Sequence, residues 1–275
     1  MRLAVAQIIS GEDLAGNLAL IREYATRARD AGAELVVFPE AAMRAFGNTL
    51  ADIAEPVDGP WATAVRDMAR ELGIAVVAGM FTPGIDGRVR NTLLVTGPGL
   101  DTSYDKIHLF DAFGFAESDS VDAGAAPVTF ELHGVVVGLA TCYDVRFPAL
   151  FTANARAGAQ VNIVCASWGA GEGKAEQWDL LVRARAVDST TFVVASGQGD
   201  PASVGIESAG SAPTGIGRSA VVSPLGTTLA TLGAAPDLMV VDIDPSTIAD
   251  VRAKLPVLAN ARSLRGHTNV ESAGR

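Results

Sequence analysis

Cysteine and histidine are scarce in this 275-residue sequence, which contains two cysteines and three histidines. Cys142 and Cys165 lie far apart, and no two histidines have the spacing of metal ligands, so no metal site is expected. The apolar segment 3–9 is too short for a signal peptide and breaks at Ser10, which predicts a strand and a cytoplasmic location. In such a reducing compartment, both cysteines are expected to be thiols.

Basic residues and long apolar runs are also lacking. Lysine and arginine number 21 against 31 aspartates and glutamates, and this net charge of −10 disfavours a nucleic-acid partner. No apolar run approaches the ~18 residues that a membrane span requires, so no membrane partner is expected. Because 49% of the residues are hydrophobic and only 19% are charged, the chain can bury a large core, which excludes global disorder.

The first third of the chain alternates between strand-like and helix-like patterns. Apolar residues after Asp13 recur at three- and four-residue steps until Gly32, and a second helical pattern of this kind ends at Gly73. The resulting β-α-β-α-β order favours a sheet covered by helices. The expected strands are 3–9, 34–38 and 74–81, and the expected helices are 14–28 and 61–72.

Short strands separated by glycine, proline and aspartate dominate the rest of the chain. His133 and the glycine after it predict a hairpin turn, Pro148 predicts a helix start, and 199–217 predicts a long surface loop. We expect one α/β domain at 1–262, with mixed strands in two sheets, and a polar tail at 263–275. The expected strands are 91–96, 102–105, 128–132, 135–140, 161–166 and 191–195, then a meander of 219–223, 227–231 and 238–243, and the expected helices are 148–157 and 178–186.

Three positions follow apolar strands at their carboxyl ends. Glu40, Cys142 and Trp168 each lie just past such a strand and before a predicted helix, where open α/β sheets place their active sites. Lys106 closes another short strand. Singly, each has a structural interpretation: Cys142 as a buried thiol, Glu40 as a helix-start carboxylate and Lys106 as a solvated strand end. Cys165 lies inside an apolar strand and is expected to be a core residue.

Together, Glu40, Lys106 and Cys142 make a chemically coherent set. A free cysteine thiol has a pKa of ~8.5 and is therefore little ionised at neutral pH. A carboxylate base is needed to take its proton during attack. An ammonium beside both groups stabilises a developing oxyanion and keeps the carboxylate ionised. The set therefore suits acyl transfer from an amide or a nitrile.

These residues stand in longer motifs. The motifs are Phe-Pro-Glu at 38–40, Asp-Lys-Ile-His-Leu-Phe at 105–110 and Cys-Tyr-Asp-Val-Arg-Phe-Pro at 142–148, with shorter ones at 177–178, 183–186 and 217–219. In this order and spacing the sequence resembles the nitrilase superfamily, the carbon–nitrogen hydrolases. The resemblance extends from Gln7 to about Asp244. It is interrupted at Ala149, where the family often has glutamate, and the segment 168–173 is unusually rich in glycine.

The resemblance implies a four-layer α-β-β-α sandwich of two mixed sheets, without a metal or organic cofactor. It implies Glu40, Lys106 and Cys142 as the catalytic triad, and Glu117 matches a second glutamate that family members often carry. The backbone N–H of Tyr143 would share the oxyanion hole with Lys106. The sequence looks most like small amidases that act on ω-amides of dicarboxylic acids or on deaminated glutathione.

Other functions remain open. A nitrilase or an N-carbamoyl amino acid hydrolase would use the same triad. The non-enzyme alternative is a nucleotide-binding module, because the glycine-rich segment 169–174 precedes a helix, as phosphate-binding loops do. However, Trp168 and Ala175 stand where a P-loop needs glycine and serine or threonine. His108 is an alternative partner for the thiol, although a structural role in its loop is favoured. A non-catalytic scaffold would have no physical reason to keep all three triad residues.

The sequence offers three candidate contacts for a small amide substrate. Arg146, four residues past the cysteine, and Arg44, four residues past Glu40, are able to bind a substrate carboxylate bidentately. Trp168 lies near the place where the family shapes its substrate pocket. An ion pair with Asp144 is the structural alternative for Arg146.

A homodimer or larger even assembly is also expected. The helix expected at 178–186 carries more apolar surface than one sheet face requires, and the resemblance implies a dimer formed by the helices after the cysteine. The apolar residues concerned are Trp178, Leu181 and Val182.

Overall fold

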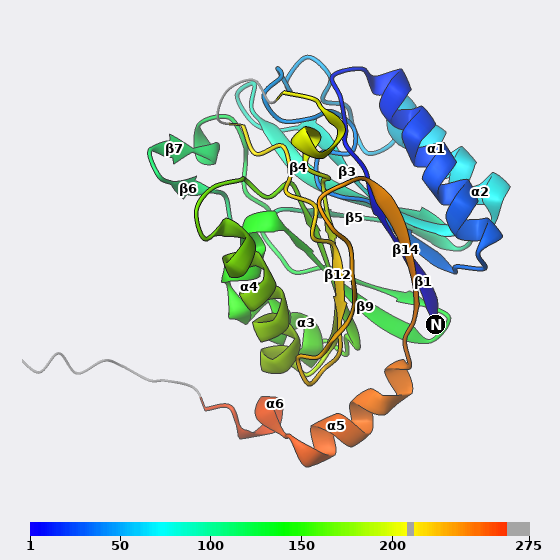
Figure 1. The fold of residues 1–275 in the computed structure, drawn as a ribbon, viewed down its shortest axis with the longest axis vertical. Coiled ribbons are helices and arrows are strands. Elements are labelled where there is room, and N and C mark those ends of the chain that lie inside the picture. Colours follow the sequence, from blue (N-terminus) through cyan, green and yellow to red (C-terminus); the bar gives the residue numbers. More distant parts are fainter. Residues whose placement is uncertain (208–211, 263–275) are drawn as a thin grey trace, which may run out of the picture.

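The chain folds into four layers in the order α-β-β-α, as the resemblance implies. The computed structural model describes residues 1–207 and 212–262. Two six-stranded sheets face each other, and a pair of helices covers the outer face of each (Figure 1). Helices α1 (Leu14–Asp30) and α2 (Pro60–Leu72) cover the first sheet, and α3 (Pro148–Arg156) and α4 (Lys174–Ser189) cover the second.

The first sheet joins the N-terminal half of the chain to a strand from its end. Strands β1, β2 and β3 are parallel, and β2 is wholly buried because the sheet is covered on both faces. Asp13 caps α1 by accepting from two backbone N–H groups, and α2 ends at Gly73 with φ 67°, as predicted. The strand order is β14 (Asp237–Asp242), β1 (Arg2–Gln7), β2 (Leu35–Val37), β3 (Ala75–Pro83), β4 (Val89–Gly97) and β5 (Leu100–Asp105).

The second sheet has three parallel strands, β9, β10 and β11, at its centre. The predicted hairpin turn joins β8 to β9, with φ 51° at His133 and φ 80° at Gly134, the left-handed values that a two-residue hairpin favours. The strand order is β13 (Thr228–Thr231), β12 (Ala220–Val222), β11 (Phe192–Gly197), β10 (Val161–Ala166), β9 (Val135–Thr141) and β8 (Thr129–Leu132).

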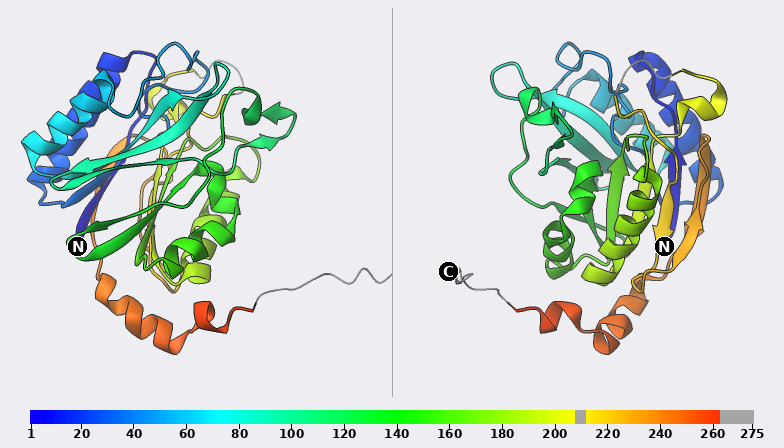
Figure 2. Two further views of the ribbon diagram at one scale, coloured as in Figure 1. Left: turned by 180° about the vertical axis from the view of Figure 1, so that it is seen from behind. Right: turned by 60° about the vertical axis from the view of Figure 1, so that its left-hand side comes forward.

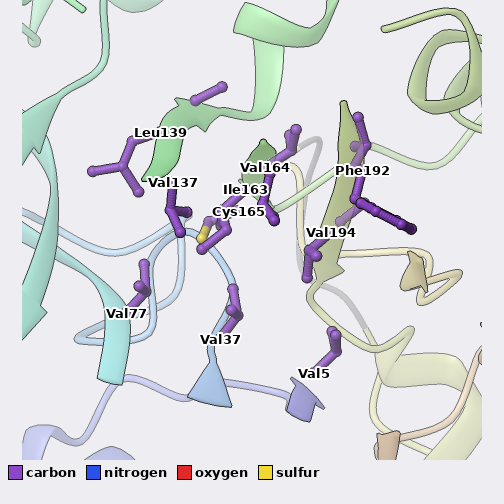
Figure 3. Close-up of a cluster of buried hydrophobic side chains, with 14 of the residues drawn as sticks. Val5, Val37, Val77, Val137, Leu139, Ile163, Val164, Cys165, Phe192 and Val194 are labelled. Atoms are coloured by element: carbon purple, nitrogen blue, oxygen red, sulfur yellow. The ribbon is translucent and has the colours of Figure 1, made fainter. Parts of the chain in front are cut away.

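The main hydrophobic core lies between the two sheets. Val5, Val37 and Val77 of the first sheet and Val137 of the second belong to one cluster of buried side chains (Figure 3). Cys165 belongs to the same cluster and is 0% exposed, which confirms that it is a core residue. A second cluster packs α1 and α2 against the outer face of the first sheet.

The predicted C-terminal meander is wrong. Strands β12 and β13 form the expected hairpin, but β14 crosses to the first sheet and pairs antiparallel with β1. Without β14, the buried strand β1 would be an unpaired edge. The buried side chain of Gln7 fixes the crossing, because its Nε2 donates to the carbonyls of Gly233 and Ala235 and its Oε1 accepts from Ser219.

The helix predicted at 61–72 is confirmed as α2, but the prediction that Glu40 lies just before a helix is wrong, because α2 begins only at Pro60. The backbone between them is held along β3 instead, with Met43 N donating to Gly79 O and Glu55 N to Phe81 O. The tail 263–275 and part of the predicted loop 199–217, residues 208–211, lie outside the described residues.

Several short elements had no sequence signal. The hairpin of β6 (Asp111–Ala112) and β7 (Phe115–Ala116) stands at one end of the sandwich, and helices α5 (Ile248–Lys254) and α6 (Val257–Asn260) lie at the opposite end (Figure 2). These segments are too short for a hydrophobic period to be recognised. The single-turn helices are η1 (Glu117–Asp119), η2 (Cys142–Arg146), η3 (Pro201–Val204) and η4 (Pro245–Thr247).

Candidate active site

Residues from four segments meet at the end of the sandwich that carries the β6–β7 hairpin. Glu40 follows β2, Lys106 follows β5 and Cys142 follows β9, while Glu117 comes directly after β7. The carboxyl ends of strands that run in one direction lie at the same edge, where such folds place their sites. Two of these side chains are in direct contact, since Lys106 Nζ lies 3.2 Å from Glu40 Oε1.

The Glu40 carboxylate is 1% exposed and accepts three hydrogen bonds. Its Oε1 accepts from Asn91 Nδ2 at 2.7 Å and from Lys106 Nζ, and its Oε2 accepts from the backbone N–H of Ser167 at 2.8 Å. Burial raises the pKa of Glu40; the Lys106 ammonium and these N–H donors only partly offset this effect, so the pKa lies above its ordinary value.

The turn that carries Glu40 packs closely on β3. A Cβ at Gly79 would lie 2.6 Å from Ala41 N and 2.9 Å from Glu40 Cα, so only glycine fits there. Gln198 Nε2 donates to the carbonyl of Glu40 at 2.9 Å and ties the turn to the segment after β11. The glutamate is therefore fixed through its backbone as well as its carboxylate.

Lys106 stands between two carboxylates. Its Nζ lies 2.8 and 2.9 Å from the two oxygens of Glu117, in addition to the contact with Glu40, and the side chain is 3% exposed. Glu117 is held in turn by the backbone N–H of Phe110, which donates to its Oε2 at 2.6 Å. Burial lowers the pKa of Lys106, but Glu40, Glu117 and Cys142 outweigh burial and hold this pKa above its ordinary value. The lysine therefore carries a fixed positive charge.

Cys142 begins η2 directly at the end of β9. Its φ of 47° lies in the left-handed region, which costs a non-glycine residue ~1–2 kcal/mol. Its Sγ lies 3.8 Å from the carbonyl of Ser167. Burial and the nearby Glu40 carboxylate raise the pKa of the thiol well above its ordinary value, against the opposing effect of Lys106. The thiol is therefore protonated at neutral pH and needs a base to become a nucleophile.

Asp144 ties the cysteine turn to the end of β5. Its fully buried carboxylate accepts from the backbone N–H of Thr141 at 2.8 Å and from the Tyr104 hydroxyl at 2.6 Å. It also accepts from the backbone N–H of His108 at 3.0 Å and lies 2.7 Å from His108 Nδ1. The ring of His108 stacks on Phe147. This geometry fits the structural role that the sequence favoured for His108.

Arg146 lies over aromatic rings, and the ion pair with Asp144 that was the structural alternative for it is not formed. Its guanidinium is 5.1 Å from the ring of Trp168 and 5.8 Å from the ring of Tyr143, and it donates to Gln177 Oε1 at 2.8 Å. The Asp144 carboxylate has no room for Arg146 because backbone, tyrosine and histidine groups already occupy both of its oxygens.

The two other candidate substrate contacts are largely buried. Arg44 pairs with Asp52 at 3.0 Å and donates to the carbonyls of Glu12 and Thr49, so its guanidinium is engaged away from the triad residues. Trp168 is 5% exposed and packs on Trp178 with ring centroids 5.2 Å apart.

Three residues that touch the site were missed in the sequence. Asn91 and Ser167 both bind Glu40, and Asp144 fixes the turn of the cysteine. Asn91 did carry a signal, because it is a polar residue inside the apolar strand β4. Ser167 acts through its backbone N–H, which any residue other than proline supplies, so its identity could not reveal it.

Within residues 1–207 and 212–262, no three or more histidine, cysteine, aspartate or glutamate side chains are grouped to hold a metal ion. No helix in this part of the chain has the length and apolar character needed to cross a membrane. In the glycine-rich segment 169–174, the Lys174 ammonium lies over the rings of Phe110 and Phe113, 5.7 and 4.6 Å from their centroids.

The profile of the carbon–nitrogen hydrolase family matches residues 2–253. A hydrolase of Mycobacterium tuberculosis (strain ATCC 25618 / H37Rv) is 56% identical over 94% of this chain and 95% of its own. The deaminated glutathione amidase of Escherichia coli O157:H7 is 33% identical over 90% of this chain and 91% of its own.

A solved structure gives the same assignment. An amidase of Nesterenkonia sp. AN1, from the nitrilase superfamily, is 28% identical over 93% of this chain and 98% of its own, with a TM-score of 0.75. That structure contains the product of Michael addition of acrylamide at the active site cysteine. The match over almost the whole chain shows that this protein belongs to the carbon–nitrogen hydrolase family, within the nitrilase superfamily.

Proposed function

We propose that the protein is an amidase that cleaves the C–N bond of a small amide through a thioester on Cys142. The products are ammonia and a carboxylic acid. The observation that carries this proposal is the buried contact between Lys106 and Glu40 beside the half-buried Cys142, whose thiol pKa the Glu40 carboxylate helps to raise. The family assignment and the relatives named as amidases support the same class of reaction.

In the first half of the reaction, Glu40 takes the thiol proton while Sγ of Cys142 attacks the amide carbon. The carbonyl oxygen becomes an oxyanion, which the Lys106 ammonium and the backbone N–H of Tyr143 stabilise. Glu40 then gives its proton to the amide nitrogen, the C–N bond breaks, and ammonia leaves. A thioester remains on Cys142, and Glu40 is again ionised.

In the second half, water attacks the thioester and Glu40 takes its proton. The tetrahedral intermediate collapses, the C–S bond breaks, and the carboxylic acid leaves. The proton on Glu40 returns to the thiolate. Glu117 keeps Lys106 in place through both halves of the reaction, because it binds the ammonium with both of its oxygens. The backbone N–H of Phe110 fixes the Glu117 carboxylate in turn.

We expect the best substrates to be ω-amides of dicarboxylic acids. Arg146, which lies over Tyr143 and Trp168, is the candidate partner for the second carboxylate. Arg44 is the weaker candidate because Asp52 already neutralises it. The deaminated glutathione amidase of Escherichia coli O157:H7 supports a small amide carrying carboxylates.

An ammonia-release screen tests this substrate class. It compares succinamate and other ω-amides with aliphatic amides, nitriles and N-carbamoyl amino acids, at equal concentration. We expect the ω-amides to be hydrolysed fastest and the nitriles poorly. A nitrile or an N-carbamoyl compound at the head of the screen would contradict the amidase assignment and leave the triad in place.

We also propose a homodimer formed through α4, but not through the residues first expected. Trp178 and Val182 are each 1% exposed and pack in the core of the single chain. The exposed apolar side chains of α4 are instead Leu180, at 67%, and Val187, at 36%.

Light scattering tests the assembly. We expect twice the mass of the 28.3 kDa chain, and a shift towards monomer for Leu180→Glu, which places a charge on the exposed face of α4. Glu131→Gln, on an exposed face of β8, serves as a control that keeps the wild-type mass. A monomer for the wild-type chain at working concentration would contradict the proposal.

A further inference from the structure

Asn91 contacts both Glu40 and Lys106 of the candidate site. It lies on β4 opposite Phe81 of β3, is 0% exposed, and donates from Nδ2 to Glu40 Oε1 at 2.7 Å. Its backbone carbonyl accepts from the backbone N–H of Lys106 at 2.9 Å. Asn91 therefore binds the carboxylate of Glu40, the proposed base, and also the backbone of Lys106, whose ammonium contacts that carboxylate.

The oxygen of the Asn91 amide, Oδ1, is buried and accepts no hydrogen bond from residues 1–207 and 212–262. A buried amide oxygen without a donor lowers stability, and leucine, of similar size, would avoid that cost. The folded core alone therefore gives no reason for an amide here, and the side chain makes its hydrogen bond to Glu40.

The Asn91 bond is also the shorter of two bonds to the same oxygen. Lys106 Nζ lies 3.2 Å from Glu40 Oε1 but 2.8 Å from Glu117, so the ammonium divides its hydrogen bonds between two carboxylates. In the part of the chain that the structure describes, Asn91 Nδ2 donates to Glu40 and to no second acceptor. The asparagine therefore fixes the direction of the Glu40 carboxylate independently of the lysine.

We propose that Asn91 is a positioning residue, which keeps Glu40 ionised and aimed at Cys142 for proton transfer. This inference rests on the proposed function, in which Glu40 is the base. The hydrogen bond from Asn91 lowers the pKa of Glu40 against the larger effect of burial. Without this donor, the carboxylate takes up a proton at higher pH and turns more freely. The ionisable groups that interact with Glu40 are Lys106, Glu117, Cys142 and Cys165, and none of them replaces a neutral donor.

The test compares Asn91→Leu with the neighbouring variant Thr92→Val. Thr92 is also fully buried, but its hydroxyl bonds to Asp105 and Thr82 instead of Glu40. Turnover of succinamate, or of the fastest amide in the screen above, is measured between pH 4 and 9, together with the melting temperature. The Glu40→Gln variant is measured in parallel.

For Asn91→Leu we expect kcat to fall about 10- to 100-fold, because a hydrogen bond to a charged group is lost. We expect the acid limb of its pH–rate profile to move to higher pH by about one unit. The melting temperature should fall only slightly, because removal of the unpaired Oδ1 offsets part of the lost hydrogen bond. Thr92→Val should lose some thermal stability and keep the wild-type acid limb. The inference is overturned if the acid limb of the pH profile does not move in Asn91→Leu, or if this variant loses activity only in proportion to its loss of stability. An inactive Glu40→Gln would still support the proposed function in that case. An active Glu40→Gln overturns the proposed function itself.

Discussion

Cys142→Ala should abolish turnover, whereas Cys165→Ala should keep most of it. Only Cys142 stands in the strained turn beside Glu40 and Lys106, and without its sulfur no thioester forms. Cys165 also has a raised pKa, caused by burial and by Glu40, but it is 0% exposed in the core between the sheets (Figure 3). Ammonia release measures turnover, and the intact mass after rapid quenching detects an acyl group on the wild-type chain.

The two variants control for each other because both remove one buried or half-buried thiol. Cys165→Ala leaves a small void and should lower the free energy of unfolding by ~1 kcal/mol, which thermal melting detects. Cys142→Ala keeps the backbone strain at φ 47°, because alanine also has the Cβ that disfavours this conformation. An active Cys142→Ala together with an inactive Cys165→Ala would show that the nucleophile was assigned to the wrong cysteine.

Most of the fold was predictable from local sequence because its central strands are buried on both faces. The prediction 161–166 coincides with β10, in which all six residues are buried. A continuous apolar run bounded by polar residues identifies such a strand without any knowledge of its neighbours. Pairing between distant strands could not be predicted in this way. Strand β14 pairs with β1 from almost the other end of the chain, and the crossing depends on hydrogen bonds of Gln7.

The candidate site was predictable only where residue type carries the chemistry. Glu40, Lys106 and Cys142 stand in recognisable motifs, whereas Asn91 reaches Glu40 through the β3–β4 register, which the sequence does not reveal. Asp144 stood inside a recognised motif, but its four donors come from Thr141, Tyr104 and His108, two of which belong to another segment. Residues that support a site from distant strands are therefore the least predictable part.

Glu40→Gln should lower kcat by about 10²–10⁴-fold, because a neutral amide cannot take the proton of Cys142 or of the attacking water. The variant should still fold, but with a lower free energy of unfolding. The carboxylate now accepts from Ser167 N at one oxygen and from Asn91 and Lys106 at the other. Glutamine has one oxygen, so its amide group must face one of these donors with its own N–H bonds. We expect ~1–3 kcal/mol of lost stability, measured by chemical denaturation.

The matched control is Glu55→Gln, which removes a carboxylate that accepts from the backbone N–H of Ala62 near the start of α2, outside the site. It should lose some stability and keep its turnover, which separates general destabilisation from the loss of a base. Because the pKa of Glu40 is raised, wild-type activity should fall as the pH drops through a value above the ordinary carboxyl range, and Glu55→Gln should share that limb. Near-normal turnover in Glu40→Gln would mean that its carboxylate only holds Ser167, Asn91 and Lys106 in place.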